Sequence, residues 1–117
     1  MAYRAVHVDD VETQRGVIKF MRRELGTEAF GINQFDLPPG AEGLEHDHSD
    51  SGQEEVYVIL AGSGVMRIDG DEVPLRRGLY LTVSADAVRQ PVAGPEGLSW
   101  VCVGAVPGGG YEPRGPF

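Results

Sequence analysis

Turn-forming residues interrupt this chain at short intervals, and that spacing limits the elements it can form. No stretch keeps an apolar period of about 3.6 residues, and residues 20–25 allow one helical turn at most. The pattern predicts an all-β fold, either a sandwich or a closed barrel. The strongest turn signals are Pro38-Pro39-Gly40, Gly62-Ser63-Gly64, Asp69-Gly70, Arg77-Gly78 and Gly94-Pro95. The strand-like stretches between them are residues 30–37, 44–48, 56–60, 65–68, 79–83 and 98–106.

Two of these signals predict hairpins. Asp69-Gly70 lies between two short β-rich stretches and favours a type I′ turn, because both of its positions tolerate positive φ. The segment Gly62-Ser63-Gly64 is interpreted as a second hairpin turn, since no helix follows it to build a phosphate loop. The glycine- and proline-rich residues 107–117 predict a tail, ordered only where Tyr111 or Phe117 docks.

Length and charge restrict the class of protein. The 117 residues form one domain, long enough to bury roughly two-thirds of its unfolded surface. No apolar run approaches the ~18 residues of a membrane span, and the N-terminus has no secretory signal. The single cysteine, Cys102, excludes an intrachain disulfide and favours a cytoplasmic location. The net charge of −8 argues against nucleic acid or a membrane surface as partner.

His46 and His48 stand one residue apart on a β-patterned stretch, followed by a carboxylate at Glu55. Alternate residues of a strand share a face, so the two imidazoles can converge with Glu55 on one metal ion. This ligand set suits iron, manganese, zinc, nickel or copper. Glu54 is a competing ligand, but Glu55 is favoured because it shares a strand face with Tyr57.

These residues carry a family resemblance. Gly40, five residues, His46-x-His48, a gap, Glu55, six residues and Gly62 resemble the first motif of the cupin superfamily. The gap between His48 and Glu55 is six residues, longer than the family usually has. The second motif begins at Gly78 but departs from the pattern, because Arg89 stands where the family's metal-binding histidine is expected.

The resemblance implies a small antiparallel cupin-type β-barrel, also described as a double-stranded β-helix or jelly roll. It would comprise one domain over residues 1–117, with N-terminal strands in 1–29, a barrel core at about 30–106 and the tail 107–117. It also implies a homodimer, with a divalent transition metal (iron, manganese, zinc or nickel) and a small molecule inside the barrel. The expected function is metal-dependent oxygenase or isomerase chemistry on a small anionic ligand.

Arg89 leaves three alternatives open, because a guanidinium cannot ligate a metal. With a metal on His46, His48 and Glu55, Arg89 could hold a substrate carboxylate or phosphate, and Tyr57 would also bind substrate. Without a metal, Arg89 would pair with Glu55, and the barrel would be a non-catalytic binding or scaffold protein. In the third alternative Arg89 points to solvent and has no role.

Other side chains are weaker candidates. Cys102 is interpreted as core packing, with an alternative in which Trp100, Cys102 and Gly104 share the face that lines the barrel interior. Gln34 and Gln90 are further candidates for that interior.

Overall fold

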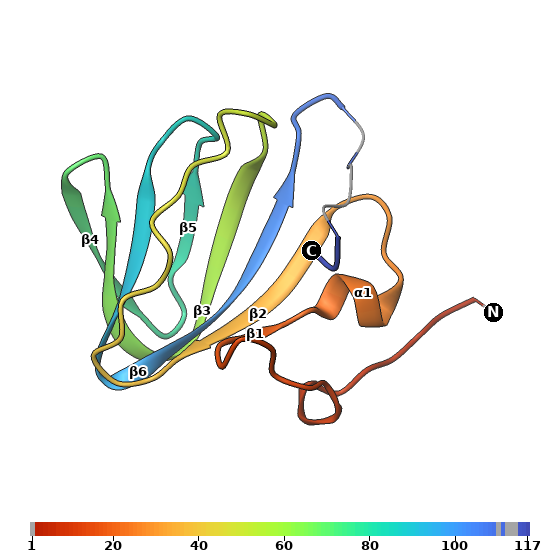
Figure 1. Cartoon of the computed structure of the whole chain (residues 1–117), viewed down its shortest axis with the longest axis horizontal. Helices are drawn as coiled ribbons and strands as arrows, with labels where there is room; N and C mark the ends of the chain where they lie inside the picture. Colours follow the sequence, from red (N-terminus) through yellow and green to blue (C-terminus); the bar gives the residue numbers. More distant parts are fainter. Residues whose placement is uncertain (1, 110, 112–114) are drawn as a thin grey trace.

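The computed structural model describes residues 2–109, 111 and 115–117 of the chain. It is almost entirely β-structure, which confirms the predicted all-β class (Figure 1). Among the described residues, no helix is long and apolar enough to cross a membrane. The elements are a 3₁₀ turn at Val8–Asp10, β1 (Ile18–Lys19), α1 (Met21–Leu25), β2 (Gly31–Leu37), β3 (Glu54–Ile68), β4 (Asp71–Arg76), β5 (Tyr80–Val83) and β6 (Arg89–Ala105).

One antiparallel sheet runs in the order β1-β2-β6-β3-β4, with β5 also paired to β3. The two longest strands, β3 and β6, pair along almost their whole length. Both strands bend as they run through the sheet, so that the sheet curves around an interior (Figure 1). This is the small single-domain barrel of jelly-roll type that the sequence predicts.

The hairpin at Asp69-Gly70 is confirmed, since φ is 48° at Asp69 and 89° at Gly70, as a type I′ turn requires. The prediction of a second hairpin at Gly62-Ser63-Gly64 is wrong, because β3 continues through these residues without a turn. The register between β3 and β6 shifts there instead, in a β-bulge. Gly62 has a φ of 77°, and a Cβ at this position would collide with the carbonyl of Gly97 on β6. The glycines therefore let two paired strands bend together rather than ending a strand.

Two other boundary predictions also need correction. Residues 44–48 form no strand of their own, because this segment touches β6 only through isolated bridges such as His46 with Arg89. The predicted N-terminal strands reduce to β1, and the remainder of the described N-terminal residues is turn, coil, one 3₁₀ turn and α1. In the predicted tail, the Phe117 ring packs edge-on against the Phe20 ring at a centroid distance of 5.0 Å.

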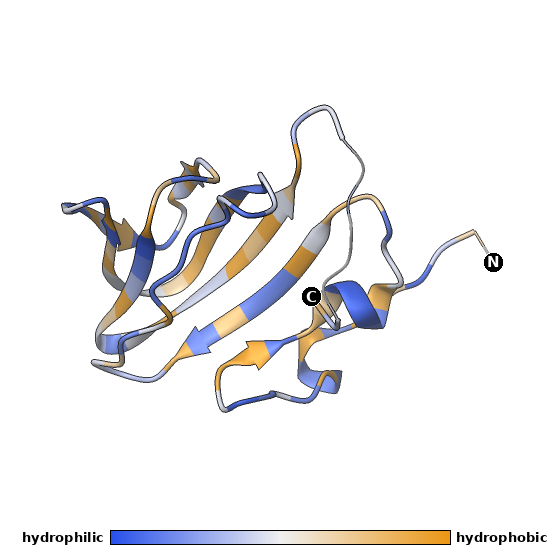
Figure 2. Ribbon diagram, turned by 45° about the horizontal axis from the view of Figure 1, so that its top comes forward, coloured by the Kyte–Doolittle hydropathy of each residue, from blue (hydrophilic) through white to orange (hydrophobic). Residues whose placement is uncertain are grey.

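The core lies between the two layers of the curved sheet. Along the strands, hydrophobic and hydrophilic residues alternate, as the banding of Figure 2 shows. The inward residues form one cluster, in which Ile59 is 1 % exposed and Met66 fully buried. This cluster continues along β6 to Trp100 and Cys102, where the packed interior opens into a cavity.

Candidate metal centre

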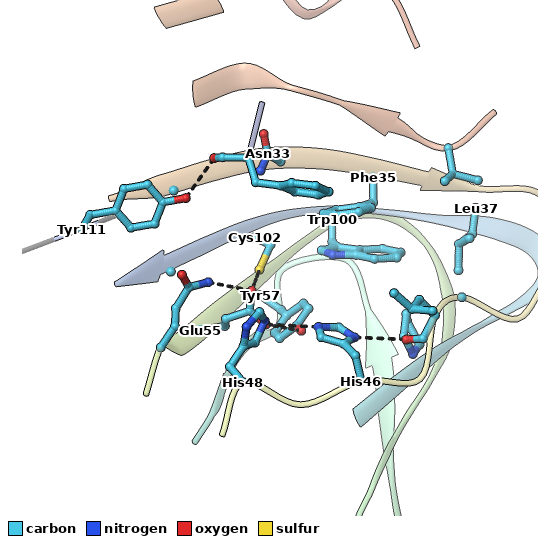
Figure 3. Close-up of a pocket in the computed structure, with 18 residues that line it drawn as sticks. Asn33, Phe35, Leu37, His46, His48, Glu55, Tyr57, Trp100, Cys102 and Tyr111 are labelled. Carbon is cyan, nitrogen blue, oxygen red and sulfur yellow. Dashed lines mark hydrogen bonds and ion pairs between the residues drawn. The ribbon is translucent and has the colours of Figure 1, made fainter. Parts of the chain in front are cut away.

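A cavity of about 380 Å³ lies inside the barrel, and most of its wall is apolar. Its floor comes from the inward faces of β2, β3 and β6, including Phe35, Tyr57 and Trp100. His46 and His48 project into it from the loop that precedes β3, as Figure 3 shows. The charged side chain among the described lining residues, apart from the histidines, is Glu55.

His46, His48 and Glu55 converge in this cavity. One potential ligand atom from each lies within 4.8 Å of the other two. The Nε2 atoms of His46 and His48 lie 3.7 Å and 3.3 Å from the same carboxylate oxygen, Oε1 of Glu55. Glu54 on the neighbouring position is exposed, so Glu55 is the acid that the strand directs toward the histidines.

Backbone contacts orient both imidazoles. His46 exchanges two backbone hydrogen bonds with Arg89 on β6, each 2.9 Å long, and the His48 amide donates to the carbonyl of Ala85 at 2.8 Å. The Nδ1 of His46 lies 3.2 Å from the Leu44 carbonyl. A carbonyl can only accept, so Nδ1 carries a proton and Nε2 is the ring nitrogen that faces the Glu55 carboxylate.

The donor set fits a divalent transition metal. His48 Nε2 is buried and has no hydrogen-bond partner, which is costly unless another group binds there. Two imidazole nitrogens and one carboxylate oxygen are common ligands of iron, manganese, zinc and nickel. A metal ion held by His46, His48 and Glu55 would satisfy the unpartnered nitrogen and would have positions open toward the cavity.

Glu55 is also surrounded by hydrogen-bond donors. The Tyr57 hydroxyl donates to Oε1 at 2.8 Å, and the Cys102 thiol donates to Oε2 at 3.1 Å. The Gln53 amide adds a longer bond to Oε2 at 3.4 Å. The thiol therefore contacts Oε2 of Glu55, whereas the two histidines approach Oε1. Cys102 is not a member of the three-residue cluster.

This environment shifts the pKa values of the site. Burial alone would raise the pKa of Glu55, but contacts with His46, His48 and Tyr57 outweigh it and hold that pKa well below its usual range. The Glu55 carboxylate raises the pKa of His46 against the opposing effect of burial. Burial, reinforced by the charge of Glu55, raises the pKa of the Cys102 thiol, which therefore stays protonated.

Arg89 is fully buried, which excludes the alternative in which it points to solvent. Its Nη2 donates to the carbonyls of Val83 and Ser84, at 3.4 Å and 2.9 Å. Its Nε lies 3.9 Å from Oε1 of Glu55, and neither Nε nor Nη1 has a hydrogen-bond partner. Arg89 does not line the main cavity. Together with Gln90 it lines a second pocket, whose other lining residues include several aspartates and glutamates. Arg89 therefore has no contact with the main cavity through which it would bind substrate, and its role in substrate binding stays a prediction.

The remaining candidates divide clearly. Tyr57 lines the cavity on the same face as Glu55, as the strand pattern predicts, and its role in substrate binding stays a prediction. Cys102 belongs to the buried core cluster, which confirms core packing, and it also lines the cavity together with Trp100 and Gly104, as the alternative interpretation expects.

The two glutamine candidates do not face the cavity. Gln34 donates to Asp36 and Gln90 donates to the carbonyl of Gly43. Sequence reasoning missed Asn33, which lines the cavity from β2. The alternation of apolar Phe35 and Leu37 with polar Asp36 is the signal that could have placed Asn33 inward.

Comparison with known proteins gives a family, a relative and solved structures of the same fold. The family model for the cupin domain matches residues 33–104. A dimethylsulfoniopropionate lyase, DddW, from Ruegeria pomeroyi is 40% identical over 79 residues, covering 62% of this chain and 49% of the lyase. The match thus spans about half the length of that relative.

Solved structures show the same fold. A cupin protein from Bacteroides fragilis superposes with a TM-score of 0.79 at 24% identity, covering 99% of this chain and 94% of the other. A sugar phosphate isomerase of the cupin superfamily from Silicibacter pomeroyi superposes with a TM-score of 0.73 at 22% identity, covering 87% and 75%. The first cupin motif, the barrel and the match over residues 33–104 agree, and the chain belongs to the cupin superfamily.

Proposed function

We propose that this chain is a metal-dependent enzyme that acts on a small carboxylate inside the barrel. The observation that carries the proposal is the convergence of His46, His48 and Glu55 at a cavity. His48 Nε2 is buried there, 3.3 Å from Glu55 Oε1, without a well-formed hydrogen bond. A structural histidine normally finds a protein partner for a buried ring nitrogen. The open side of the cluster faces a space of about 380 Å³, which suits a molecule of a few carbon atoms.

The metal would be held by His46, His48 and Glu55, and when bound it supplies Lewis acidity toward a carboxylate oxygen. The chain's own residues prepare the surroundings. The apolar wall of Phe35 and Trp100 limits the water around a bound molecule. The Tyr57 hydroxyl fixes the orientation of Glu55, and burial raises the pKa of Tyr57, so that this group holds its proton.

The relative from Ruegeria pomeroyi supports a lyase over the other reaction classes. Its name describes the cleavage of a propionate that bears a sulfonium group. In an elimination of this kind a base takes the proton next to the carboxylate, and the electron pair of that C–H bond forms a carbon–carbon double bond. The leaving group on the adjacent carbon departs with the electron pair of its own bond. It needs no second substrate and no oxidant. Oxygenase and isomerase chemistry, which the ligand set also allows, would give different products.

A second candidate is a metal-free cupin that binds a small molecule without converting it. It is favoured by Arg89, whose buried guanidinium lies 3.9 Å from Oε1 of Glu55 and partly neutralises the carboxylate. The pair His46 and His48 favours the enzyme, because a metal-free protein would leave the buried His48 Nε2 without a well-formed hydrogen bond. A homodimer and a cytoplasmic location complete the proposal, and they rest on the family resemblance and on the single cysteine.

The experiment is a turnover assay on protein loaded separately with iron(II), manganese, zinc and nickel. Dimethylsulfoniopropionate and small 3-substituted propionates are the substrates, and acrylate formation is measured by chromatography. We expect product with at least one metal, and loss of product in His46→Ala and Glu55→Gln. Gln34→Ala is the matched control, because Gln34 lies on β2 but faces away from the cavity. Absence of turnover with all four metals, together with unchanged metal content in His46→Ala, would overturn the proposal.

A further inference from the structure

Three residues that line the cavity carry a buried polar side-chain atom with no hydrogen-bond partner. They are His48 at Nε2, Asn33 at Oδ1 and Trp100 at Nε1. A metal on the three-residue cluster accounts for His48. It does not account for Asn33 or Trp100, neither of which belongs to that cluster. Buried polar groups are almost always paired, so a carboxamide oxygen and an indole N–H without a protein partner mark positions that a ligand or an ordered water can fill.

Asn33 and Trp100 belong to the wall formed by β2 and β6. Asn33 pairs with Cys102, and Cys102 pairs in turn with Tyr57, so these three residues lie abreast across the sheet. Adjacent strands are about 4.8 Å apart, which places the Cα of Asn33 roughly 10 Å from the Cα of Tyr57. Trp100 is the next inward residue on β6, and its ring stacks on Phe35 at a centroid distance of 5.0 Å. Asn33 and Trp100 are therefore diagonal neighbours on adjacent strands of this wall (Figure 3).

The other polar groups near the cluster are already engaged. Gln53, Tyr57 and Cys102 all donate to the carboxylate of Glu55. Asn33, by contrast, is 7% exposed and makes no hydrogen bond through Oδ1. No lysine, arginine or aspartate is found among the described residues that line the cavity. The end of a ligand that reaches this wall would thus meet neutral polar groups set among aromatic rings.

The chemistry of the two groups defines what they can bind. A carboxamide accepts through its oxygen and donates through its nitrogen, and an indole N–H only donates. A partner for both must accept one hydrogen bond and offer one, without a charge that this apolar wall would leave unbalanced. A hydroxyl group or a primary carboxamide meets these requirements. A methyl or a sulfonium group does not, because neither one accepts a hydrogen bond.

We propose that Asn33 and Trp100 determine ligand specificity by binding an uncharged hydroxyl or carboxamide at the end of the ligand remote from the metal cluster. The ligand would then be a small hydroxy acid or amide acid. This inference rests on the proposed function in one respect, which is that the carboxylate of the ligand occupies the end of the cavity with His46, His48 and Glu55. The selection between a neutral polar end and an apolar end depends on Asn33 and Trp100 alone.

The test compares matched ligands of nearly equal size by isothermal titration calorimetry. The pairs are 4-hydroxybutyrate with pentanoate and 3-hydroxypropionate with butanoate, and dimethylsulfoniopropionate is included as an onium probe. Metal content is measured on the same samples, and titrations are run on metal-loaded and on metal-free protein. We expect at least one hydroxy acid to bind about tenfold more tightly than its apolar partner, as one or two neutral hydrogen bonds allow.

The variants Asn33→Leu and Trp100→Phe remove the polar atoms and keep the approximate shape. Both should abolish the preference for the hydroxy acid and leave metal content unchanged. The control Gln34→Ala, on the other face of β2, should leave the preference intact. Asn33→Leu should also keep or raise the melting temperature, because it replaces an unpaired buried amide by an apolar group. A fall in melting temperature would indicate that Asn33 has a structural partner and would contradict the inference.

The outcomes separate this inference from the proposed function. Equal affinity for the members of both pairs, or no binding of any probe, overturns the inference whether or not metal is present. Tight binding of dimethylsulfoniopropionate that Asn33→Leu leaves unchanged also overturns it, since the aromatic rings would then select the ligand. A preference for the hydroxy acid in protein that holds no metal supports the inference and contradicts the proposed function.

Discussion

The two halves of β6 have different neighbours. The half from Leu98 to Gly104 pairs with β2 through seven consecutive residues and forms a regular ladder. The half from Arg89 to Ala93 lies beside the loop that carries His46 and His48, and isolated bridges such as that between His46 and Arg89 join the two. The part of the sheet in which β2 and β3 pair with Leu98 to Gly104 of β6, here called the ladder wall, is continuous with the buried core. The loop that carries His46 and His48, here called the loop edge, is attached at a few points.

This difference separates the stability of the barrel from the placement of the two histidines. The ladder wall holds the barrel together through regular hydrogen bonds and buried side chains. The loop edge places two imidazoles where a metal needs them, because a segment outside the ladder can take the direction that its ligands require. The comparison predicts that truncating an apolar core side chain of the ladder wall alters the free energy of unfolding and spares the metal, whereas removing a histidine at the loop edge does the reverse.

The largest effect is expected for Ile59→Ala. Ile59 is 1% exposed and pairs with Trp100 in the ladder wall. Its truncation should lower the free energy of unfolding by about 2–5 kcal/mol through lost burial and a residual cavity. Urea denaturation checks this, with Ile59→Val as a milder control. Metal affinity should be unchanged in the folded variant, and a parallel loss of metal would break the separation between the two regions.

His48→Ala tests the loop edge. Removing one of three ligands should weaken metal binding at least about 100-fold, measured by competition with a chromophoric chelator. The free energy of unfolding of the metal-free protein should fall only modestly, because His48 Nε2 makes no well-formed hydrogen bond and contacts only the Glu55 carboxylate, at 3.3 Å. A large loss of stability without a loss of metal affinity would show that His48 is a packing residue.

Arg89→His tests the position where the two regions meet. Arg89 is the cross-strand partner of His46, so a histidine here would add a fourth ligand and remove a buried positive charge. We expect metal affinity to rise by roughly tenfold or more. Arg89→Leu is the matched control, since it removes the charge without adding a ligand. Equal affinities for the two variants would indicate that residue 89 cannot reach the metal.

The smallest effect is expected for Leu44→Ala. The Leu44 side chain is 76% exposed, and its contact with His46 is made by the backbone carbonyl. Stability should therefore change by less than about 0.5 kcal/mol. Metal affinity should stay within about twofold of the wild type in the same chelator competition. A marked loss of metal would mean that the side chain, rather than the carbonyl, orients the imidazole.

Local patterns in the sequence predicted much of the fold. Asp69-Gly70 determined its own turn because both residues tolerate positive φ, and alternation along β3 placed Glu55 and Tyr57 on one face. The bend at Gly62 could not be recognised from sequence, because a glycine ends a strand and bends a strand with the same local conformation. The carbonyl of Gly97, far along the chain, decides between the two.

The candidate site was predicted in part for the same reason. The pair His46-x-His48 is a local signal, and so is the register that selects Glu55 over Glu54. The surroundings of Arg89 depend on carbonyls of Val83 and Ser84 and on the carboxylate of Glu55, which the chain brings together only on folding. Among the donors around Glu55, Gln53 and Tyr57 lie two residues away along the chain, a spacing that alternation captures, whereas Cys102 is distant in sequence and reaches Glu55 only because β3 pairs with β6.

The central claim is that His46, His48 and Glu55 hold one metal ion. The most direct test is an anomalous difference map, collected at the edges of iron, manganese, zinc and nickel from crystals grown after expression in metal-supplemented medium. The predicted result is one peak per chain within bonding distance of both imidazole Nε2 atoms and of the Glu55 carboxylate, absent in His48→Ala. A map without a peak at these three side chains, from protein with only trace metal by elemental analysis, would contradict the claim.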